Sequence, residues 1–113
     1  MEIVAEPFER EAELLKALAH PIRLVILETL SLGEECVCHL TALLNRPQPY
    51  VSKQLAELRE AGLVIDRRDA QRIYYRLADD RISELLEAAR ALSGRTETAI
   101  RESVPGCSCP RCS

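Results

Sequence analysis

The stretch that decides the fold is residues 35–64, which read ECVCHLTALLNRPQPYVSKQLAELREAGLV. An apolar run comes first, and the residues NRP at 45–47 then form a tight break. Pro49 suits an early position of a following helix, and Gly62 suits its C-terminal stop. The buried face of that helix is supplied by Val51, Leu55 and Leu58. Two helices joined by so short a break predict a helix-turn-helix.

The segments on either side extend this unit in both directions. The predicted elements are helices over residues 7–18, 21–32, 34–44 and 49–61, β-prone runs over 63–65 and 73–75 around a polar tip at 66–72, and a last helix over 80–94. This order predicts a mainly α fold with a small β-hairpin. It is the order of a winged helix-turn-helix, in which the hairpin is the wing.

The first and last predicted helices each carry an apolar stripe that a domain this small cannot cover. We therefore expect a homodimer, with these helices at the interface. One domain is expected over residues 1–102, for DNA binding and dimerisation. Residues 103–113, which include SVPGCSCPRCS, have no periodicity and are expected to form a flexible, cysteine-rich tail.

The charge of the chain is unevenly distributed. The formal net charge is −3, but residues 45–76 hold seven basic and four acidic side chains. A basic face on an acidic body is compatible with DNA binding and disfavours tight non-specific binding. The acidic N-terminus lacks a signal-peptide apolar region, and no run reaches the roughly 20 apolar residues of a membrane span. We expect a soluble, cytosolic protein without membrane contact.

The expected DNA contacts lie on the second helix of the helix-turn-helix and on the wing. They are Gln48, Tyr50, Ser52, Lys53 and Gln54 on the helix, and Arg67, Arg68, Gln71 and Arg72 on the wing. We expect Ser52, Lys53 and Gln54 to matter most. Tyr74 and Tyr75 are expected to pack in the wing, one inward and one outward. A dimer implies double-stranded operator DNA with an inverted repeat.

Five cysteines form two clusters, Cys36 and Cys38 in the middle and Cys107, Cys109 and Cys112 at the end. In a reducing compartment, clustered cysteines are more often metal ligands or redox sensors than disulfides. Residues two apart on a helix point about 200° away from each other. Either Cys36 and Cys38 sit at a loose first turn, or ligand binding unwinds that turn.

Three segments together resemble the ArsR–SmtB family of metal-sensing repressors. They are LKALAHPIRLVILETL at 15–30, the stretch 35–64 quoted above, and DRRDAQRIYYRL at 66–77. The Cys-Val-Cys motif at 36–38 is similar to the arsenic-responsive branch and to a cadmium- and lead-responsive branch. The resemblance implies a repressor that an ion bound to thiolates releases from DNA, and it implies neither an enzyme nor an organic cofactor.

The chain departs from the family pattern in four places. Thr41 stands where the arsenic-type motif has its third cysteine, and His20 stands where the family usually has an aspartate helix cap. The last predicted helix has no histidine, so the zinc-type site is absent. The Cys-x-Cys-x-x-Cys of the tail is unusual. We expect His20 to cap a helix and His39 to be a partly exposed polar residue rather than a ligand.

The inducer expected first is As(III) or Sb(III), which form a pyramidal site with three thiolates. The third thiolate could come from the tail of the same or the partner subunit, or the tail could form a separate site. Two thiolates alone could hold a monosubstituted arsenical. The alternatives are Cd(II) or Pb(II), a thiol redox switch, and a metal buffer that does not bind DNA.

Overall fold

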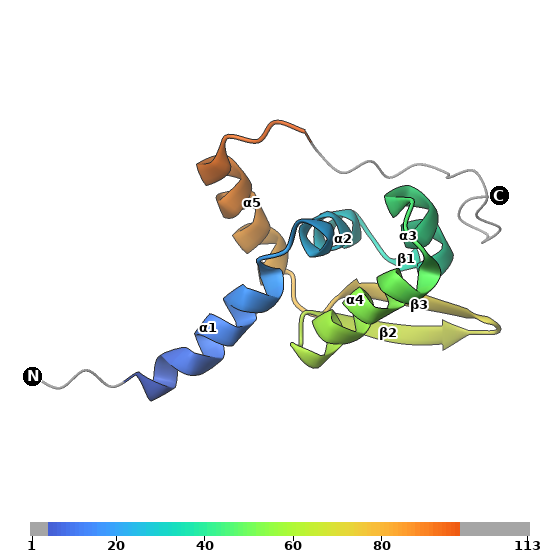
Figure 1. Cartoon of the computed structure of the whole chain (residues 1–113), viewed down its shortest axis with the longest axis horizontal. Coiled ribbons are helices and arrows are strands. Elements are labelled where there is room, and N and C mark those ends of the chain that lie inside the picture. Colours follow the sequence, from blue (N-terminus) through green and yellow to red (C-terminus); the bar gives the residue numbers. More distant parts are fainter. Residues whose placement is uncertain (1–4, 98–113) are drawn as a thin grey trace, which may run out of the picture.

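The computed structural model describes residues 5–97, in which five helices and a small sheet form the fold and the β2–β3 ribbon extends at one edge (Figure 1). The helices are α1 (Glu6–Leu18), α2 (Pro21–Ser31), α3 (Val37–Leu44), α4 (Gln48–Glu60) and α5 (Arg81–Ser93). The strands are β1 (Glu35–Cys36), β2 (Val64–Asp69) and β3 (Arg72–Leu77). The sheet is antiparallel in the order β1-β3-β2. The predicted winged helix-turn-helix is confirmed: α3 and α4 form the helix-turn-helix, and β2 and β3 form the wing.

Local signals in the sequence set most helix ends. Pro21 occupies the first turn of α2, and the Nδ1 atom of His20 accepts a hydrogen bond from the Ile22 N–H at 3.2 Å, so His20 is the predicted cap. Asn45 after α3 and Gly94 after α5 adopt the left-handed conformation, with φ of 51° and 77°. These residues stop the helices because the following chain turns away from the helix axis.

The core is aliphatic and lies where α2, α3, α4 and the sheet meet. Four leucines there are fully buried: Leu27, Leu40, Leu55 and Leu58. Burying each leucine side chain stabilises the fold by about 1.5–3 kcal/mol. Tyr75 joins this cluster from β3, whereas Tyr74 is half-buried, as predicted for a pair that points to opposite sides. The core therefore fixes α4 and the wing relative to each other.

Two elements differ from the prediction. Residues 34–36 were expected to begin α3, but Glu35 and Cys36 form β1, which pairs with Tyr75 and Tyr74 of β3. The polar residues 66–72 were expected to be a loop, but β2 and β3 continue to a two-residue turn at Ala70 and Gln71. The wing is polar because it is a two-stranded ribbon with much of its surface in water, so the hydrophobic alternation of a half-buried strand is missing.

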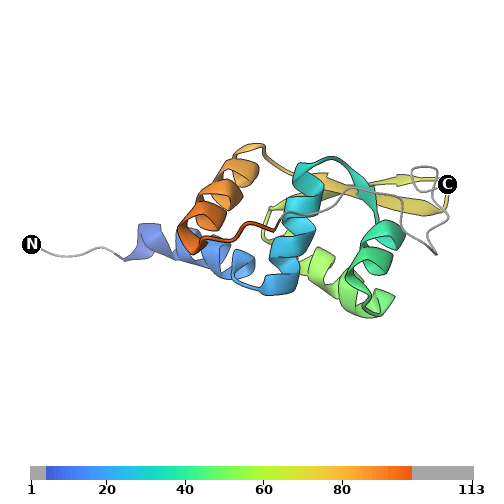
Figure 2. The same ribbon diagram turned by 90° about the horizontal axis from the view of Figure 1, so that it is seen from above.

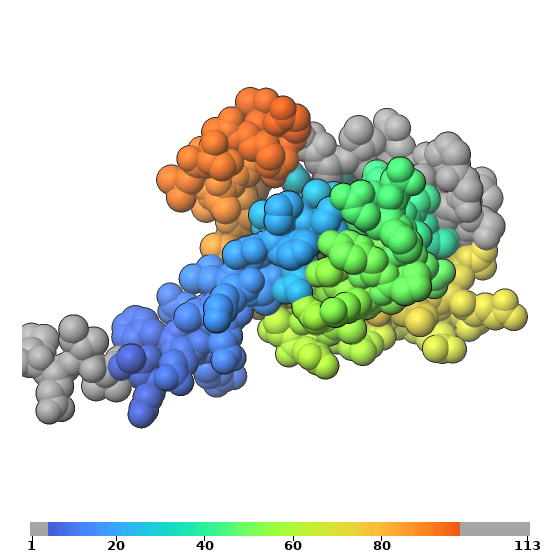
Figure 3. Space-filling model, viewed as in Figure 1, coloured from blue at the N-terminus to red at the C-terminus, as the bar shows by residue number. Residues whose placement is uncertain are grey.

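Helices α1 and α5 lie at the periphery. α1 extends away from the body of the molecule and buries only Leu18 (Figures 2 and 3). α5 is held against α2 by Glu28, which accepts hydrogen bonds from Arg90 at 3.2 Å and from Arg95 at 2.9 Å. Within residues 5–97 no helix is both long and apolar enough to cross a membrane.

Candidate DNA interface and thiol site

The first half of α4 presents an exposed polar surface. Gln48, Ser52 and Lys53 are exposed, and Tyr50 is half-buried. Gln48 and Ser52 are one helical turn apart and so lie on the same face of α4. The opposite face, with Val51 and Leu55, is buried in the core. This orientation leaves the amino-terminal part of α4 available to a DNA groove.

Gln54 does not share this surface, contrary to the prediction that it reads bases. Its side chain is only 6% exposed, and its Oε1 atom accepts a hydrogen bond from the Nε of Arg23 at 2.7 Å. The interacting arginine lies 31 positions earlier in the chain. Residues 51, 54, 55 and 58 have the spacing of one helix face, so Gln54 lies on the buried face of α4, whereas Gln48 is exposed. The tertiary structure adds the partner of Gln54, which is Arg23.

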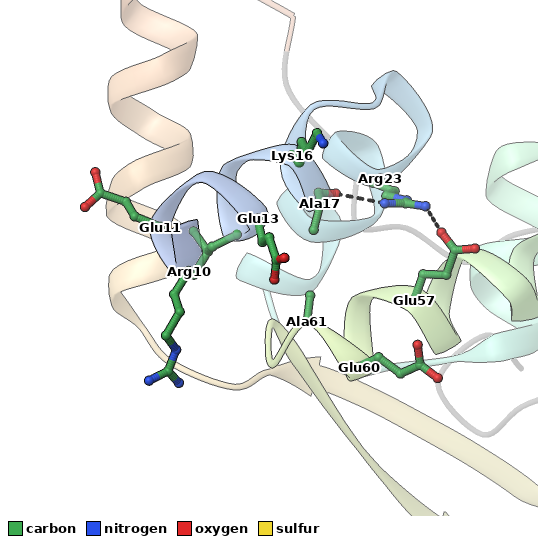
Figure 4. A pocket seen from close by; sticks show the side chains of 10 residues that line it. Arg10, Glu11, Glu13, Lys16, Ala17, Arg23, Glu57, Glu60 and Ala61 are labelled. Carbon is green, nitrogen blue, oxygen red and sulfur yellow. Dashed lines mark hydrogen bonds and ion pairs between the residues drawn. The ribbon is translucent and has the colours of Figure 1, made fainter. Parts of the chain in front are cut away.

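Arg23 of α2 connects this helix to α1 and to α4, beside a groove that lies between the three helices. Its guanidinium donates to the carbonyl oxygen of Ala17 at 3.2 Å and forms an ion pair with Glu57 of α4 (Figure 4). Together with the bond to Gln54, these contacts fix the orientation of α4 relative to the end of α1. Arg23 is thus a structural residue that sequence reasoning missed, because its acceptors lie on other helices.

The wing carries the second predicted set of DNA contacts. Arg68 and Gln71 are exposed, and Arg72 is half-buried. Arg67 is exposed as well, but its guanidinium donates to both carboxylate oxygens of Glu34, at 2.7 and 2.8 Å. The same guanidinium lies 4.6 Å from the ring centre of Tyr74. The hydrogen bond from Arg67 holds the pKa of Glu34 below its ordinary value.

The two central cysteines converge at the start of α3. Cys36 is the N-cap, with extended backbone angles (φ −83°, ψ 159°), and its Sγ accepts a hydrogen bond from the His39 N–H at 3.3 Å. The Sγ atoms of Cys36 and Cys38 are 2.7 Å apart, and neither residue forms a disulfide within the described residues. The 200° separation of a regular helix does not apply because Cys36 precedes the helix. This geometry is the loose first turn of the two alternatives.

The thiols open onto a cavity of about 290 Å³ that reaches the elements of the candidate DNA interface. Its lining includes Cys36, Cys38, Gln48, Ser52, Gln71 and Tyr75. Gln48 and Ser52 belong to α4, and Gln71 belongs to the turn of the wing. The thiol site and both parts of the candidate DNA interface therefore border the same space.

A buried acid–base pair lies beside the thiols. His39 and Glu35 are both fully buried, and the His39 Nε2 is 3.6 Å from the Glu35 Oε2. The prediction of a partly exposed His39 is wrong. A polar residue in a short helix is normally expected at the surface, but β1 brings Glu35 to the same buried region.

The described residues do not contain a complete three-ligand site. Within residues 5–97 there is no group of three or more histidine, cysteine, aspartate or glutamate side chains placed to hold a metal ion. The predicted ligands Cys107, Cys109 and Cys112 lie outside the described residues. Cys36 and Cys38 are thus the only candidate sulfur ligands whose geometry is described.

The fold and the exposed face of α4 define a DNA-binding regulator of the winged helix-turn-helix class. Residues 20–66 match the family model "Bacterial regulatory protein, arsR family". The chain is 52% identical over 81 residues to the "Biofilm growth-associated repressor" of Agrobacterium fabrum, covering 72% of this chain and 69% of that protein. The chain belongs to the ArsR/SmtB family of transcriptional repressors.

Two further proteins are similar to this chain. The "Arsenical resistance operon repressor" of Escherichia coli K12 is 48% identical over 67 residues, covering 58% of this chain and 57% of that protein. A homodimeric winged helix-turn-helix DNA-binding domain from Mycobacterium bovis, a possible ArsR-family regulator, superposes with a TM-score of 0.73 at 30% identity. The superposed region covers 83% of this chain and 91% of the Mycobacterium bovis domain. These relatives are named as regulators and not as enzymes.

Proposed function

We propose that this chain is a metalloid-responsive repressor that As(III) or Sb(III) releases from operator DNA. The observation that carries the proposal is the convergence of the Cys36 and Cys38 thiols, 2.7 Å apart, beside the cavity that α4 and the wing share. Soft thiolates select thiophilic ions. The similarity to an arsenical resistance repressor supports the same assignment.

The third thiolate is proposed to come from Cys107, Cys109 or Cys112, in the same or the partner subunit. Arsenous acid and three thiols would then form an As(SCys)₃ site and release three water molecules, with no change of oxidation state. Backbone N–H groups at the start of α3 would stabilise negative charge on Cys36. A separate site formed by the tail cysteines alone remains the competing arrangement, and the variants below distinguish the two.

The signal is proposed to reach DNA through Cys36, because this residue belongs to two elements at once. It pairs with Tyr74 of the wing, and it also caps α3, which packs against α4. Bonds from the ion to Cys36 and Cys38 would shift both elements together. A ligand that favours the shifted state by about 1–3 kcal/mol weakens DNA binding about 5- to 150-fold.

We propose that the chain acts as a homodimer on an inverted repeat. Apolar side chains are exposed on both peripheral helices, including Phe8 of α1 at 62% and Leu92 of α5 at 91%. Burial of such residues against a second copy is the usual solution in a small domain. The homodimeric relative from Mycobacterium bovis supports this arrangement.

A direct test measures fluorescence anisotropy of the DNA segment upstream of the gene that encodes this chain. Arsenite, antimonite, Cd(II), Pb(II) and hydrogen peroxide are added separately to the complex. Release at the lowest concentration by arsenite or antimonite supports the proposal. Release by Cd(II) or Pb(II) alone, or by peroxide alone, supports the metal-ion or redox alternative. Failure to bind this DNA without any addition contradicts the proposal that the operator lies in this segment.

The tail cysteines provide a second prediction. The triple variant Cys107→Ser, Cys109→Ser, Cys112→Ser is expected to require at least about tenfold more arsenite for release, because a third thiolate is lost. X-ray absorption at the arsenic edge should then show fewer than three sulfur ligands. An unchanged response in the triple variant would exclude the tail from the sensing site.

Thr41 offers a matched rescue. It follows Cys38 by three residues on α3, so the two side chains lie on one helix face. The Thr41 hydroxyl is buried, and within the described part of the chain it neither accepts nor donates a hydrogen bond. The substitution Thr41→Cys in the triple variant is therefore expected to restore the arsenite response, and absence of rescue would argue that the tail acts in another way.

A third prediction concerns the proposed DNA contacts, which are the exposed or half-buried side chains of α4 and the wing. Their members are Gln48, Tyr50, Ser52, Lys53, Arg68, Gln71 and Arg72. Lys53→Gln is expected to weaken operator binding about 5- to 150-fold, as for loss of a base contact. Lys16→Gln, the same change on α1, serves as the control. Equal losses of operator affinity in the two variants would show that only the overall charge of the chain affects binding.

A further inference from the structure

Arg67 occupies an unusual position for a wing arginine. In the sheet it pairs with Tyr74, and Tyr74 pairs on its other side with Cys36. The guanidinium lies over the ring of Tyr74 and reaches Glu34, the residue before β1. Both of its bonds to the Glu34 carboxylate are shorter than 2.9 Å. This two-pronged geometry is the strongest form of a carboxylate–guanidinium pair.

The neighbouring arginine provides an internal comparison. Arg68 is also exposed on β2, but within the described part of the chain it forms no ion pair. Adjacent residues of a strand point to opposite faces, so the two guanidinium groups have different surroundings. Arg68 is available to a phosphate, whereas Arg67 is already bound to a carboxylate.

We propose that Glu34 is a positioning residue that competes with DNA phosphate for Arg67 and keeps this arginine out of contact with the DNA backbone. The inference rests on the assignment as a DNA-binding repressor. Phosphate contacts add affinity without sequence information. Withholding one such contact keeps the basal affinity low enough for a modest inducer effect to release the DNA.

The side-chain surroundings of the pair support this competition. The Arg67 guanidinium lies over the Tyr74 ring, and this cation–π contact helps to hold the arginine beside Glu34. Asp69 adds a second carboxylate 3.8 Å from Arg67. The pKa of Arg67 is raised by the hydrogen bonds to Glu34, in agreement with a stable pair. A DNA phosphate would have to replace the contacts of Arg67 with both Glu34 and Asp69.

The test compares Glu34→Gln, Arg67→Gln, Arg68→Gln and the double variant Glu34→Gln/Arg67→Gln, with Glu60→Gln as a control for loss of one negative charge. Dissociation constants are measured for the upstream DNA and for an unrelated duplex of equal length at several salt concentrations. Thermal unfolding followed by circular dichroism checks that each variant folds.

Glu34→Gln is expected to bind both duplexes about 3- to 10-fold more tightly at 50 mM salt, because Arg67 gains a phosphate. One extra phosphate contact steepens the logarithmic salt slope by about 0.9, so this advantage shrinks about 3.5-fold by 200 mM salt. Arg67→Gln alone is expected to change affinity by less than about twofold, whereas Arg68→Gln weakens binding. The double variant should return to the original affinity.

Two results would overturn the proposal. One is a loss of affinity in Arg67→Gln as large as in Arg68→Gln, since Arg67 would then already contact DNA in the unaltered protein. The other is unchanged or weaker binding by Glu34→Gln. If the unaltered chain binds neither duplex, the assignment as a DNA-binding repressor fails instead, so the two failures are distinguishable.

Discussion

Replacing Cys36 or Cys38 by serine is expected to abolish the release of operator DNA by arsenite. The unaltered chain should show a 5- to 150-fold loss of affinity at saturating arsenite, and each variant less than about twofold. The reason is geometric: the two Sγ atoms are 2.7 Å apart, and no third ligand for an ion is grouped with them within residues 5–97. Loss of either thiol removes one of the two converging sulfurs, so residues 5–97 keep a single sulfur to combine with the proposed tail thiolate.

Serine is a suitable replacement because it keeps the local structure. Cys36 is the N-cap of α3 and accepts a hydrogen bond there, and serine is a preferred residue at this position. The measurement is the anisotropy titration with arsenite, repeated for each variant. Lys16→Gln, which lies on α1 outside the thiol site, is the control and should keep the normal arsenite response. A normal arsenite response in both Cys36→Ser and Cys38→Ser would contradict the proposed sensing site.

The second large effect concerns stability. His39→Ala is expected to lower the free energy of unfolding by about 3–5 kcal/mol, because it removes one partner of a buried acid–base pair and leaves Glu35 in the core. Urea denaturation followed by circular dichroism measures the change. The large effect is expected because both side chains are fully buried, so the polar group that remains after the substitution is held away from water.

His20→Ala is the matched control for this experiment. His20 caps α2 and is only half-buried, so its loss should cost about 0.5–2 kcal/mol. The double variant Glu35→Leu/His39→Leu tests the cause, since replacing both members of a buried pair by apolar residues is often close to neutral. Equal destabilisation by His39→Ala and His20→Ala would contradict the interpretation of the buried pair.

Much of the candidate interface could be predicted because it depends on the pattern of apolar and polar residues within a single helix. Exposure of Gln48, Ser52 and Lys53 follows from the amphipathic pattern of α4, in which Val51 and Leu55 face the core. The same pattern places Gln54 on the buried face, but its hydrogen bond with Arg23 could not be predicted, since it depends on another helix. The same holds for Arg67, whose acceptor lies 33 positions away in the sequence.

The sequence by itself determined the order of helices and wing, because helix periodicity, prolines and glycines act over a few residues. It also predicted the candidate functional residues, namely the paired thiols and the basic surface. Only the tertiary structure decided how these groups are arranged. The pairing of β1 with β3 places Cys36 outside the helix, buries Glu35 beside His39 and brings Glu34 to Arg67. Such pairings join residues that are distant along the chain, and their free energy depends on packing that no local pattern records.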